Sequence, residues 1–438
     1  MTAREAALDA LEKCRRDGAW SGAAIDAVIK KAGLDARESA LAARLCLGVM
    51  QNDTLCDYYI DAFCTQKSAK LEPKLRDILR LGVYQLTMLD KIPPRAAVNE
   101  TVALCRYAHL SRATGLVNAV LRRIGDARDN LPEIKNPGTA EHLSVKFSHP
   151  LWLVTRLVDE RGYDFTEAFL RECNTPPALD IQVNTLKIGV AEYCRMLDEA
   201  DIAYKLRDFP AGSIELGGGA VTALPGFEEG LFYVQDRAAR LAVEIAAPER
   251  GMQMLDACSA PGGKAFSAAV RMQNAGSILA CDIHEKKLAL INRGAERLGI
   301  DIITTRARDA REHDAALASA FDLVIADVPC SGIGVIRKKP EIRRKRAEEL
   351  ANLPAIQLDI LKSLADAVKP GGALLYSTCT VLRAENEAVV AAFLQSRDDF
   401  CLEPFKLGEE LVESGMRTFW PNTDGTDGFF AARLKRKE

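Results

Sequence analysis

The second half of the chain alternates short apolar runs with amphipathic stretches. The apolar runs include MQMLDAC (252–258), FDLVIADV (321–328) and GGALLYSTC (371–379), and helical patterns such as EKKLALINRGAERLG (285–299) separate them. This alternation is typical of a doubly wound α/β fold with a mostly parallel sheet. In such folds ligands bind beyond the carboxyl ends of the strands. Residues 231–438 are therefore predicted to form a Rossmann-like domain whose functional site lies at that edge of the sheet.

Two further regions are predicted before this domain. Residues 1–135 carry apolar residues at three- and four-residue spacing, which indicates an all-helical domain. Residues 140–230 combine a helical pattern with a strand-like DIQVNTL (180–186) and a glycine turn at 217–219, which predicts a small α+β segment. Two interpretations of the helical domain stay open: a packing or dimerisation module, and an adaptor that binds nucleic acid.

The composition excludes few functions but several kinds of site. Among the 438 residues, 58 Lys and Arg stand against 61 Asp and Glu, so the net charge of -3 gives no reason to expect a nucleic-acid partner. The twelve cysteines are scattered without a CxxC, and the five histidines have no zinc-ligand spacing. No secretory leader or membrane-length apolar run is present. We therefore expect a cytoplasmic monomer without metal or membrane contact.

Acidic and glycine residues follow the first three predicted strands. The first strand leads into seven residues that would form a close turn around a ligand: Cys258, Ser259, Ala260, Pro261, Gly262, Gly263 and Lys264. This turn matches neither GxGxxG nor the phosphate-binding GxxxxGK[ST] pattern. Asp282 and Asp309 stand where the next two strands are predicted to end. The acids suit a cofactor with an adenosine, whereas the alternative for Asp282 is a helix N-cap.

Two cysteines follow later strands of the same predicted sheet. Cys330 comes directly after Asp327-Val328-Pro329, and Cys379 lies within Tyr376–Thr380. A single cysteine is most often a buried structural thiol, but two at the ligand-binding edge favour catalysis. Thiols beside an adenosine-type cofactor indicate pyrimidine C5 chemistry, because C5 of cytosine becomes nucleophilic only after a thiolate adds to C6. A nearby cation such as Lys264 would lower the pKa of the attacking thiol.

A strongly basic segment follows the Cys330 loop. Residues 337–346, RKKPEIRRKR, contain seven basic residues and one acid. A solvated charged face is one interpretation, and a track for the phosphate backbone of RNA is the one that its position favours. The predicted RNA-binding residues are Arg337, Lys338, Lys339, Arg343, Arg344 and Arg346.

Four segments resemble the successive motifs of the Nop/Sun family of RNA cytosine-5 methyltransferases. They are CSAPGGK (258–264), ADVPCSGIGVIRKKPEIR (326–343), LLYSTCTVLRAENE (374–387) and DGTDGFFAARL (424–434). The helical region, with IPPRAAVNETVALCR (92–106) and TGLVNAVLRR (114–123), is similar to the NusB-like RNA-binding domain of the RsmB/Sun branch. Members of that branch methylate bacterial small-subunit (16S) ribosomal RNA.

The resemblance implies S-adenosyl-L-methionine as methyl donor, held by residues 258–264. It implies that Asp282 binds the ribose hydroxyls, that Asp309 lies by the adenine, and that Asp327 lies near both donor and target base. In this family the cysteine matching Cys379 is the nucleophile and the one matching Cys330 assists product release. The resemblance thus implies methylation of C5 of a cytosine that is unpaired or flipped out.

Other interpretations of the resemblance remain. One is a cytosine-5 methyltransferase that acts on transfer RNA or another RNA. Another is a non-catalytic RNA-binding factor for ribosome assembly that retains the cofactor fold. A DNA cytosine-5 methyltransferase and a zinc deaminase fit less well, because the first has a single catalytic Pro-Cys cysteine and the second needs HxE and PCxxC.

Overall fold

The computed structural model describes residues 1–438. Its first 135 residues form amphipathic helices, as the apolar spacing predicts. The helices are α1 (Ala3–Arg16), α2 (Ser21–Ala32), α3 (Ala36–Gln51), α4 (Asp53–Phe63), α5 (Pro73–Met88), α6 (Pro94–Tyr107) and α7 (Thr114–Asp126). Local signals fix several of their ends. Thr2 and Glu5 form a capping box at the start of α1, and Pro94 occupies the first turn of α6, where no backbone donor is lost. Helix α5 is central, since it packs against α1, α3, α4, α6 and α7.

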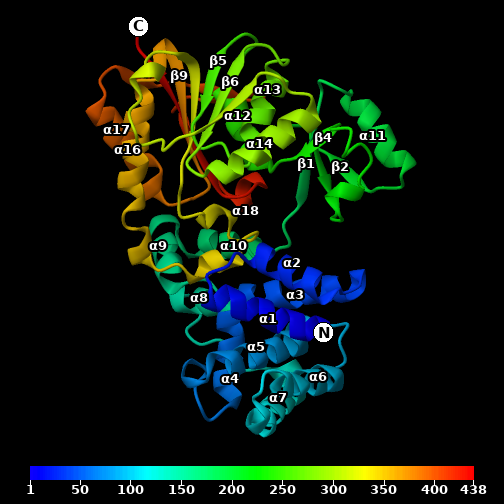
Figure 1. Cartoon of the computed structure of the whole chain (residues 1–438). Helices are drawn as coiled ribbons and strands as arrows, with labels where there is room; N and C mark the ends of the chain where they lie inside the picture. The colour runs from blue at the N-terminus through cyan, green and yellow to red at the C-terminus, as the bar shows by residue number, and fades with distance from the viewer. The chain divides into compact units, whose positions relative to one another are not determined.

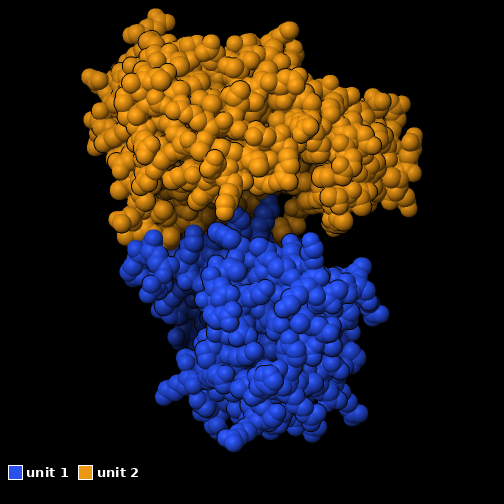
Figure 2. Space-filling model, in the orientation of Figure 1, with its two compact units in different colours: residues 1–176, 336–349 blue, residues 177–335, 350–438 orange.

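Three further helices and a later segment pack with these seven. They are α8 (Ala140–Phe147), α9 (Leu151–Arg161), α10 (Tyr163–Glu172) and residues 336–349. Helix α8 packs against α4, and the short 3₁₀ turn Pro340–Arg344 packs against α3. Unit 1 therefore comprises residues 1–176 and 336–349 (Figure 2). This division differs from the predicted boundary at 135, because α8 buries Leu143 and Phe147 instead of starting a new domain.

Unit 2 comprises residues 177–335 and 350–438 and begins with a small antiparallel sheet. Its elements are β1 (Leu179–Val183), α11 (Val190–Glu199), β2 (Tyr204–Leu206), β3 (Ser213–Leu216) and β4 (Phe232–Val234). The strand order is β2-β3-β1-β4. Tyr193 and Leu197 of α11 are buried in one cluster with Ile181, Ile214 and Phe232 of the sheet. This is the α+β segment that the sequence predicts, but only its part after residue 176 belongs to unit 2.

A larger sheet forms the rest of unit 2, in the order β10-β14-β9-β8-β5-β6-β7, with β13 beside β14 (Figure 1). Its strands are β5 (Gln253–Asp256), β6 (Ser277–Asp282), β7 (Ile303–Ala307), β8 (Phe321–Asp327), β9 (Val368–Thr378), β10 (Phe400–Leu402), β13 (Met416–Phe419) and β14 (Phe429–Arg436). Strands β5 to β9 pair in parallel, and β14 pairs antiparallel to β9. The predicted doubly wound, Rossmann-like fold is confirmed.

Helices cover both faces of this sheet (Figure 1). On one face lie α12 (Arg237–Ala246), α13 (Gly263–Arg271) and α14 (Glu285–Leu298), in a cluster with Met254 and Ile325. On the other lie α16 (Leu353–Ala365) and α17 (Glu387–Ser396), in a cluster with Leu255 and Val324. The remaining short elements are α15 (Ala347–Leu350), β11 (Phe405–Leu407), β12 (Glu410–Val412) and α18 (Pro421–Asp424). No helix combines the length and the apolar character that crossing a membrane requires.

Candidate active site

The predicted site residues gather where parallel strands of the large sheet end. Strands β5 and β6 end at Asp256 and Asp282, β8 ends at Asp327, and β9 ends at Thr378. Strands β8 and β9 are neighbours, and their register pairs Asp327 with Ser377. The loops that follow β8 and β9 therefore leave the sheet side by side, which is where α/β sheets bind ligands.

The two predicted cysteines meet at this edge. The Sγ atoms of Cys330 and Cys379 lie 3.1 Å apart, although 49 residues separate them along the chain. The next residues are also joined, since the Ser331 hydroxyl donates to Thr380 Oγ1 at 2.8 Å. The hydrogen bond shared with Cys379, followed by burial, raises the pKa of the Cys330 thiol well above its usual range. Near neutral pH, Cys330 therefore keeps its proton.

Lys264 and Asp327 form an ion pair within the same site. Lys264 lies in the first turn of α13, and its Nζ donates to Asp327 Oδ2 at 2.6 Å. The Ser377 hydroxyl donates to the other carboxylate oxygen at 2.8 Å, which fixes the carboxylate plane. Burial opposes the charged form of Lys264, but the Asp327 carboxylate outweighs it and raises the pKa of Lys264. The ammonium group therefore stays charged. Cys379 is among the groups that interact with it electrostatically.

The turn at residues 258–264 is tied to the end of β6. The Ser259 amide donates to the Cys281 carbonyl at 2.7 Å, and the Ala260 amide donates to Asp282 Oδ2 at 3.2 Å. Gly262 has a φ of +108°, and a Cβ added there would lie 2.6 Å from the Phe266 ring, so only glycine fits. The turn thus presents bare backbone, as the sequence predicts.

Two acids follow neighbouring strands beside this turn. Asp282 ends β6 and accepts from the His284 amide at 2.9 Å, whereas the N-cap of α14 is His284. The N-cap alternative for Asp282 is therefore wrong. Asp309 lies just beyond β7, the next strand, and pairs with Arg311 at 2.5 Å. That hydrogen-bonded pair lowers the pKa of Asp309, so its carboxylate is available as a hydrogen-bond acceptor.

Asp256 is a buried acid that the sequence analysis did not single out. Both of its carboxylate oxygens are buried and have no hydrogen-bond partner. Burial raises the pKa of Asp256 to about 7, and the charge of Lys264 opposes this rise. Its position at the end of the first strand of a ligand-binding sheet was the available signal.

Folding stability is expected to depend on pH through Asp256. Between its ordinary pKa of 3.8 and about 7, the folded chain holds a proton that the unfolded chain has released. Raising the pH through this window therefore destabilises the fold, by a total on the order of 2 to 4 kcal/mol. The Asp256→Asn variant lacks this term, so it should gain stability relative to wild type between pH 5 and pH 8, as measured by denaturant unfolding. Equal pH slopes for the two proteins would show that Asp256 ionises normally.

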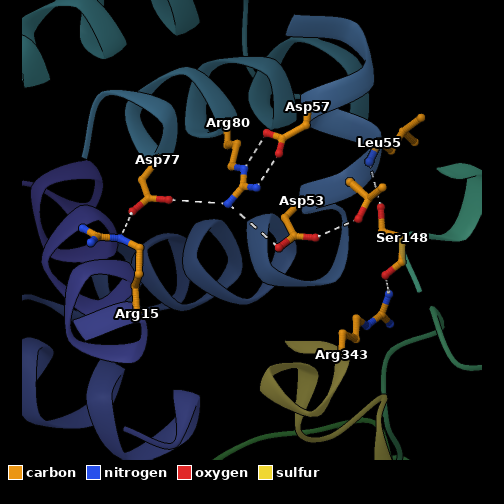
Figure 3. A network of polar contacts seen from close by, with 9 residues as sticks. Arg15, Asp53, Leu55, Asp57, Asp77, Arg80, Ser148 and Arg343 are labelled. Atoms are coloured by element: carbon orange, nitrogen blue, oxygen red, sulfur yellow. Dashed lines mark hydrogen bonds and ion pairs between the residues drawn. The ribbon is translucent and has the colours of Figure 1, made fainter. Parts of the chain in front are cut away.

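The predicted basic track is only partly exposed, because Arg343 is buried inside unit 1 (Figure 3). Its Nη1 donates to the backbone carbonyls of Gln51, Phe147 and Ser148 at 2.7, 2.9 and 3.1 Å. Its Nη2 donates to Asn174 Oδ1 at 2.6 Å. Burial lowers the pKa of Arg343 to about 10. All of these hydrogen-bond partners lie inside unit 1, so the prediction that Arg343 contacts RNA is withdrawn.

Figure 3 shows that the polar contacts of Arg343 lead, through Ser148, to the helices of unit 1. The Ser148 hydroxyl accepts from the Leu55 amide at 2.9 Å in the first turn of α4. Beyond it, Arg80 forms a bidentate pair with Asp57, at 2.7 and 2.6 Å. Burial opposes the Arg80 charge, but its acidic neighbours raise the pKa of Arg80 above its usual range. The basic segment is thus integrated into unit 1.

The other five predicted RNA-binding residues differ in exposure. Lys339 and Arg346 are exposed, and Lys339 Nζ lies 5.0 Å from the centre of the Trp20 ring. Arg344 and Lys338 are half-buried, and so is Arg337, whose guanidinium lies 3.7 Å from the Glu172 carboxylate. The exposed members of the track are therefore few.

Family models match three successive parts of the chain. Residues 243–435 match the model described as 16S rRNA methyltransferase RsmB/F. Residues 1–126 match the NusB family, and residues 149–220 match the ferredoxin-like domain of RsmF/B-like methyltransferases. The last match begins within unit 1, at α9, and ends in the small antiparallel sheet of unit 2. The resemblance of the helical region to NusB is thereby confirmed.

Relatives of known name or structure cover nearly the whole chain. A Bacillus subtilis protein described as a probable ribosomal RNA small subunit methyltransferase B is 35% identical over 99% of this chain and 98% of its own. Ribosomal RNA small subunit methyltransferase B of Escherichia coli is 31% identical over 92% of this chain and 91% of its own. The crystal structure of PH0851 is similar over 99% of both chains, with a TM-score of 0.83 and 28% identity. The chain therefore belongs to the ribosomal RNA small subunit methyltransferase B family.

Proposed function

We propose that this protein transfers a methyl group from S-adenosyl-L-methionine to C5 of a cytosine in small-subunit ribosomal RNA. The observation that carries the proposal is the thiol pair of Cys330 and Cys379, 3.1 Å apart, next to the Lys264–Asp327 ion pair. Addition to C6 requires one thiolate, and a second thiol beside it is placed to assist release, whereas a plain hydride or phosphoryl transfer needs neither. The names of the relatives support the choice of ribosomal RNA.

The residues beside the thiols fit the proposed methyl donor. Gly262, where a Cβ would meet the Phe266 ring, lets the turn expose its backbone beside the acids that follow β6 and β7. We assign residues 258–264 to the methionine and ribose part, Asp282 to the ribose hydroxyls, and Asp309 to the adenine. Lys264, the last residue of this turn, pairs with Asp327, which precedes the Cys330 loop by three residues. When bound, S-adenosylmethionine supplies an electrophilic methyl group.

The chain's own groups then divide the work on the base. The Cys379 thiolate adds to C6, and charge develops on the ring toward N3. Lys264 donates a hydrogen bond toward N3 and stabilises that charge, and the Asp327 carboxylate accepts from the amino group. After methyl transfer, solvent water takes up the C5 proton, and the C5–H electron pair forms the C5–C6 double bond. The S–C6 bond breaks in the same step, and its electron pair returns to Cys379 as a thiolate. The protonated Cys330 thiol, held 3.1 Å away, donates a hydrogen bond to that thiolate and so assists release.

Labelled methyl transfer tests this proposal directly. The purified protein is given labelled S-adenosylmethionine with unmodified small-subunit ribosomal RNA, and with transfer RNA and DNA in parallel. Label recovered as 5-methylcytosine in the ribosomal RNA is the expected result. Label in transfer RNA alone would retain the reaction and overturn the substrate, and donor binding without any transfer would favour the assembly-factor alternative.

The Cys330→Ala variant is expected to accumulate a covalent protein–RNA adduct. Cys379 can still add to C6, but its departure loses the hydrogen bond from the neighbouring thiol. The adduct should appear as a shifted band on a denaturing gel when donor and RNA are both present. The matched control is Cys330→Ala combined with Cys379→Ala, which should give no shifted band. If the Cys330→Ala enzyme turned over at the wild-type rate, Cys330 would have no role in the mechanism.

Neutralising Arg344 and Arg346 tests what remains of the RNA track. Each lost phosphate contact should reduce the slope of log affinity against log salt by about 0.7 to 0.9. Donor affinity should stay unchanged, since both residues lie outside the cofactor turn. The matched control neutralises Lys30 and Lys31, which are exposed on α2. An unchanged slope would leave the segment as a solvated face.

A further inference from the structure

We infer that Glu385 is a positioning residue whose buried side chain holds Cys330 in place against Cys379. The inference rests on the proposed function, and it assigns to Glu385 the release step that Cys330 assists. Glu385 ends the 3₁₀ turn Arg383–Glu385, six residues after Cys379, and only 2% of it is exposed.

The Glu385 carboxylate contacts one neighbour of Cys330 directly and the other through Gln357. Its Oε2 atom accepts from the Ser331 amide at 2.8 Å and from Gln357 Nε2 at 2.9 Å. Gln357 Nε2 also donates to the Pro329 carbonyl at 3.0 Å. The residue before Cys330 and the residue after it are therefore fixed through one carboxylate oxygen. All four side chains or amides involved are buried or nearly so, so water does not compete for these bonds.

The segment around Cys379 is held by hydrogen bonds that do not involve the Glu385 carboxylate. The Tyr376 hydroxyl donates to the backbone carbonyl of Glu385, not to its side chain. Asn386 Nδ2 donates to the Thr380 carbonyl at 3.0 Å, and the Thr378 hydroxyl donates to Asn386 Oδ1 at 2.7 Å. Removing the Glu385 side chain thus frees the Cys330 loop and leaves the supports of the nucleophile intact.

Stability alone does not explain a carboxylate at this position. Glu385 has no basic partner, and its Oε1 atom is buried without a hydrogen bond. Burying such a charge is unfavourable, and a neutral glutamine would offer the same acceptor to Ser331. The charge does affect the site, since it is one of the groups that raise the pKa of Cys330. The titratable groups facing Cys330 are Cys379, Glu385, Asp327 and Tyr376.

Four variants of the full chain test the inference: Glu385→Ala, Glu385→Gln, Glu387→Ala and Cys330→Ala. Glu387 is the matched control, because it lies two residues on and bonds only to Thr418. Turnover, the KM for the donor and the fraction of RNA-linked protein are measured for each. Glu385→Ala should accumulate the adduct, as Cys330→Ala does, with turnover lowered about 10- to 100-fold and the donor KM unchanged. Glu385→Gln should restore most of the turnover, and Glu387→Ala should match wild type.

Other outcomes separate this inference from the proposed function. If Cys330→Ala traps the adduct and Glu385→Ala either turns over normally or loses activity without trapping it, the positioning role is overturned. If Cys330→Ala itself traps nothing, the release step of the proposed function fails, whatever Glu385 does. Should Glu385→Ala not fold, Glu385→Gln decides alone. This variant keeps an acceptor for the Ser331 amide, so adduct accumulation equal to that of Cys330→Ala would overturn the inference.

Discussion

Replacing Cys379 with alanine is expected to abolish methyl transfer, with a loss of about four orders of magnitude or more. Without a thiolate to add to C6, C5 of cytosine has no carbanion character and does not accept the methyl group. The Lys264–Asp327 pair remains, but it stabilises a charge that no longer forms. Transfer of labelled methyl to ribosomal RNA under single-turnover conditions measures the effect. Donor affinity should be unchanged, which shows that the site is still folded.

Cys401→Ala is the matched control for this loss. Cys401 lies in β10, at the edge of the same sheet, and is exposed. Its replacement should leave the rate within a factor of about two, as for most surface positions. A Cys379→Ala enzyme that still forms a denaturant-resistant adduct through Cys330 would reverse the roles of the two thiols. One that transfers methyl at the wild-type rate would remove covalent catalysis altogether.

The meeting of the two thiols follows from features that a sequence displays. Each cysteine comes just after an apolar run, and runs separated by helices form parallel strands. The carboxyl ends of such strands share one edge, so Cys330 and Cys379 are predictable neighbours. The same argument brings Lys264 and Asp282 to this edge, because the glycine turn and the acids also follow strands. The 3.1 Å separation is not predictable in this way, since it depends on side-chain contacts behind the loops.

Those supporting contacts leave little trace in the sequence. Gln357 lies in the middle of α16, in a pattern that reads as an ordinary helix, and only the packed fold brings it to Glu385. Asp256 is similar, because burial and not residue type makes its carboxyl unusual. Both residues act through partners that are distant in the chain. A local pattern cannot register such partners.

The basic segment shows the opposite error, because its local pattern predicted that more of its basic residues contact RNA than the fold allows. Seven basic residues in ten suggest a solvated or RNA-binding surface, and charge density alone cannot distinguish the members. Arg343 differs from Arg346 because backbone carbonyls from three distant segments converge on it. Long-range contacts also group residues 336–349 with helices that precede them by some 200 to 300 residues, which no local pattern indicates.

Replacing Arg343 with alanine is expected to lower the free energy of unfolding of unit 1 by about 3 kcal/mol or more. Alanine removes the guanidinium donors from the carbonyls of Gln51, Phe147 and Ser148, of which only that of Phe147 keeps a further donor, Asn174 Nδ2 at 3.2 Å. It also leaves a cavity where the guanidinium was. Each buried acceptor that loses its partner costs about 1 to 3 kcal/mol, partly recovered where water enters.

Arg346→Ala provides the comparison within the same segment. Arg346 is exposed and pairs only with Glu349 at 2.7 Å, a surface pair worth about 0 to 1 kcal/mol. Guanidinium unfolding followed by peptide-resolved hydrogen exchange assigns each loss to its unit. Protection should fall in α3 and α8, whose last residues are Gln51 and Phe147, and unit 2 should keep its own stability. Arg343→Lys should recover only part of the loss, because one ammonium group has three donors for acceptors spread around a planar fork. Equal stability of Arg343→Ala and Arg346→Ala would mean that the buried guanidinium does not anchor the segment, and would return Arg343 to the RNA track.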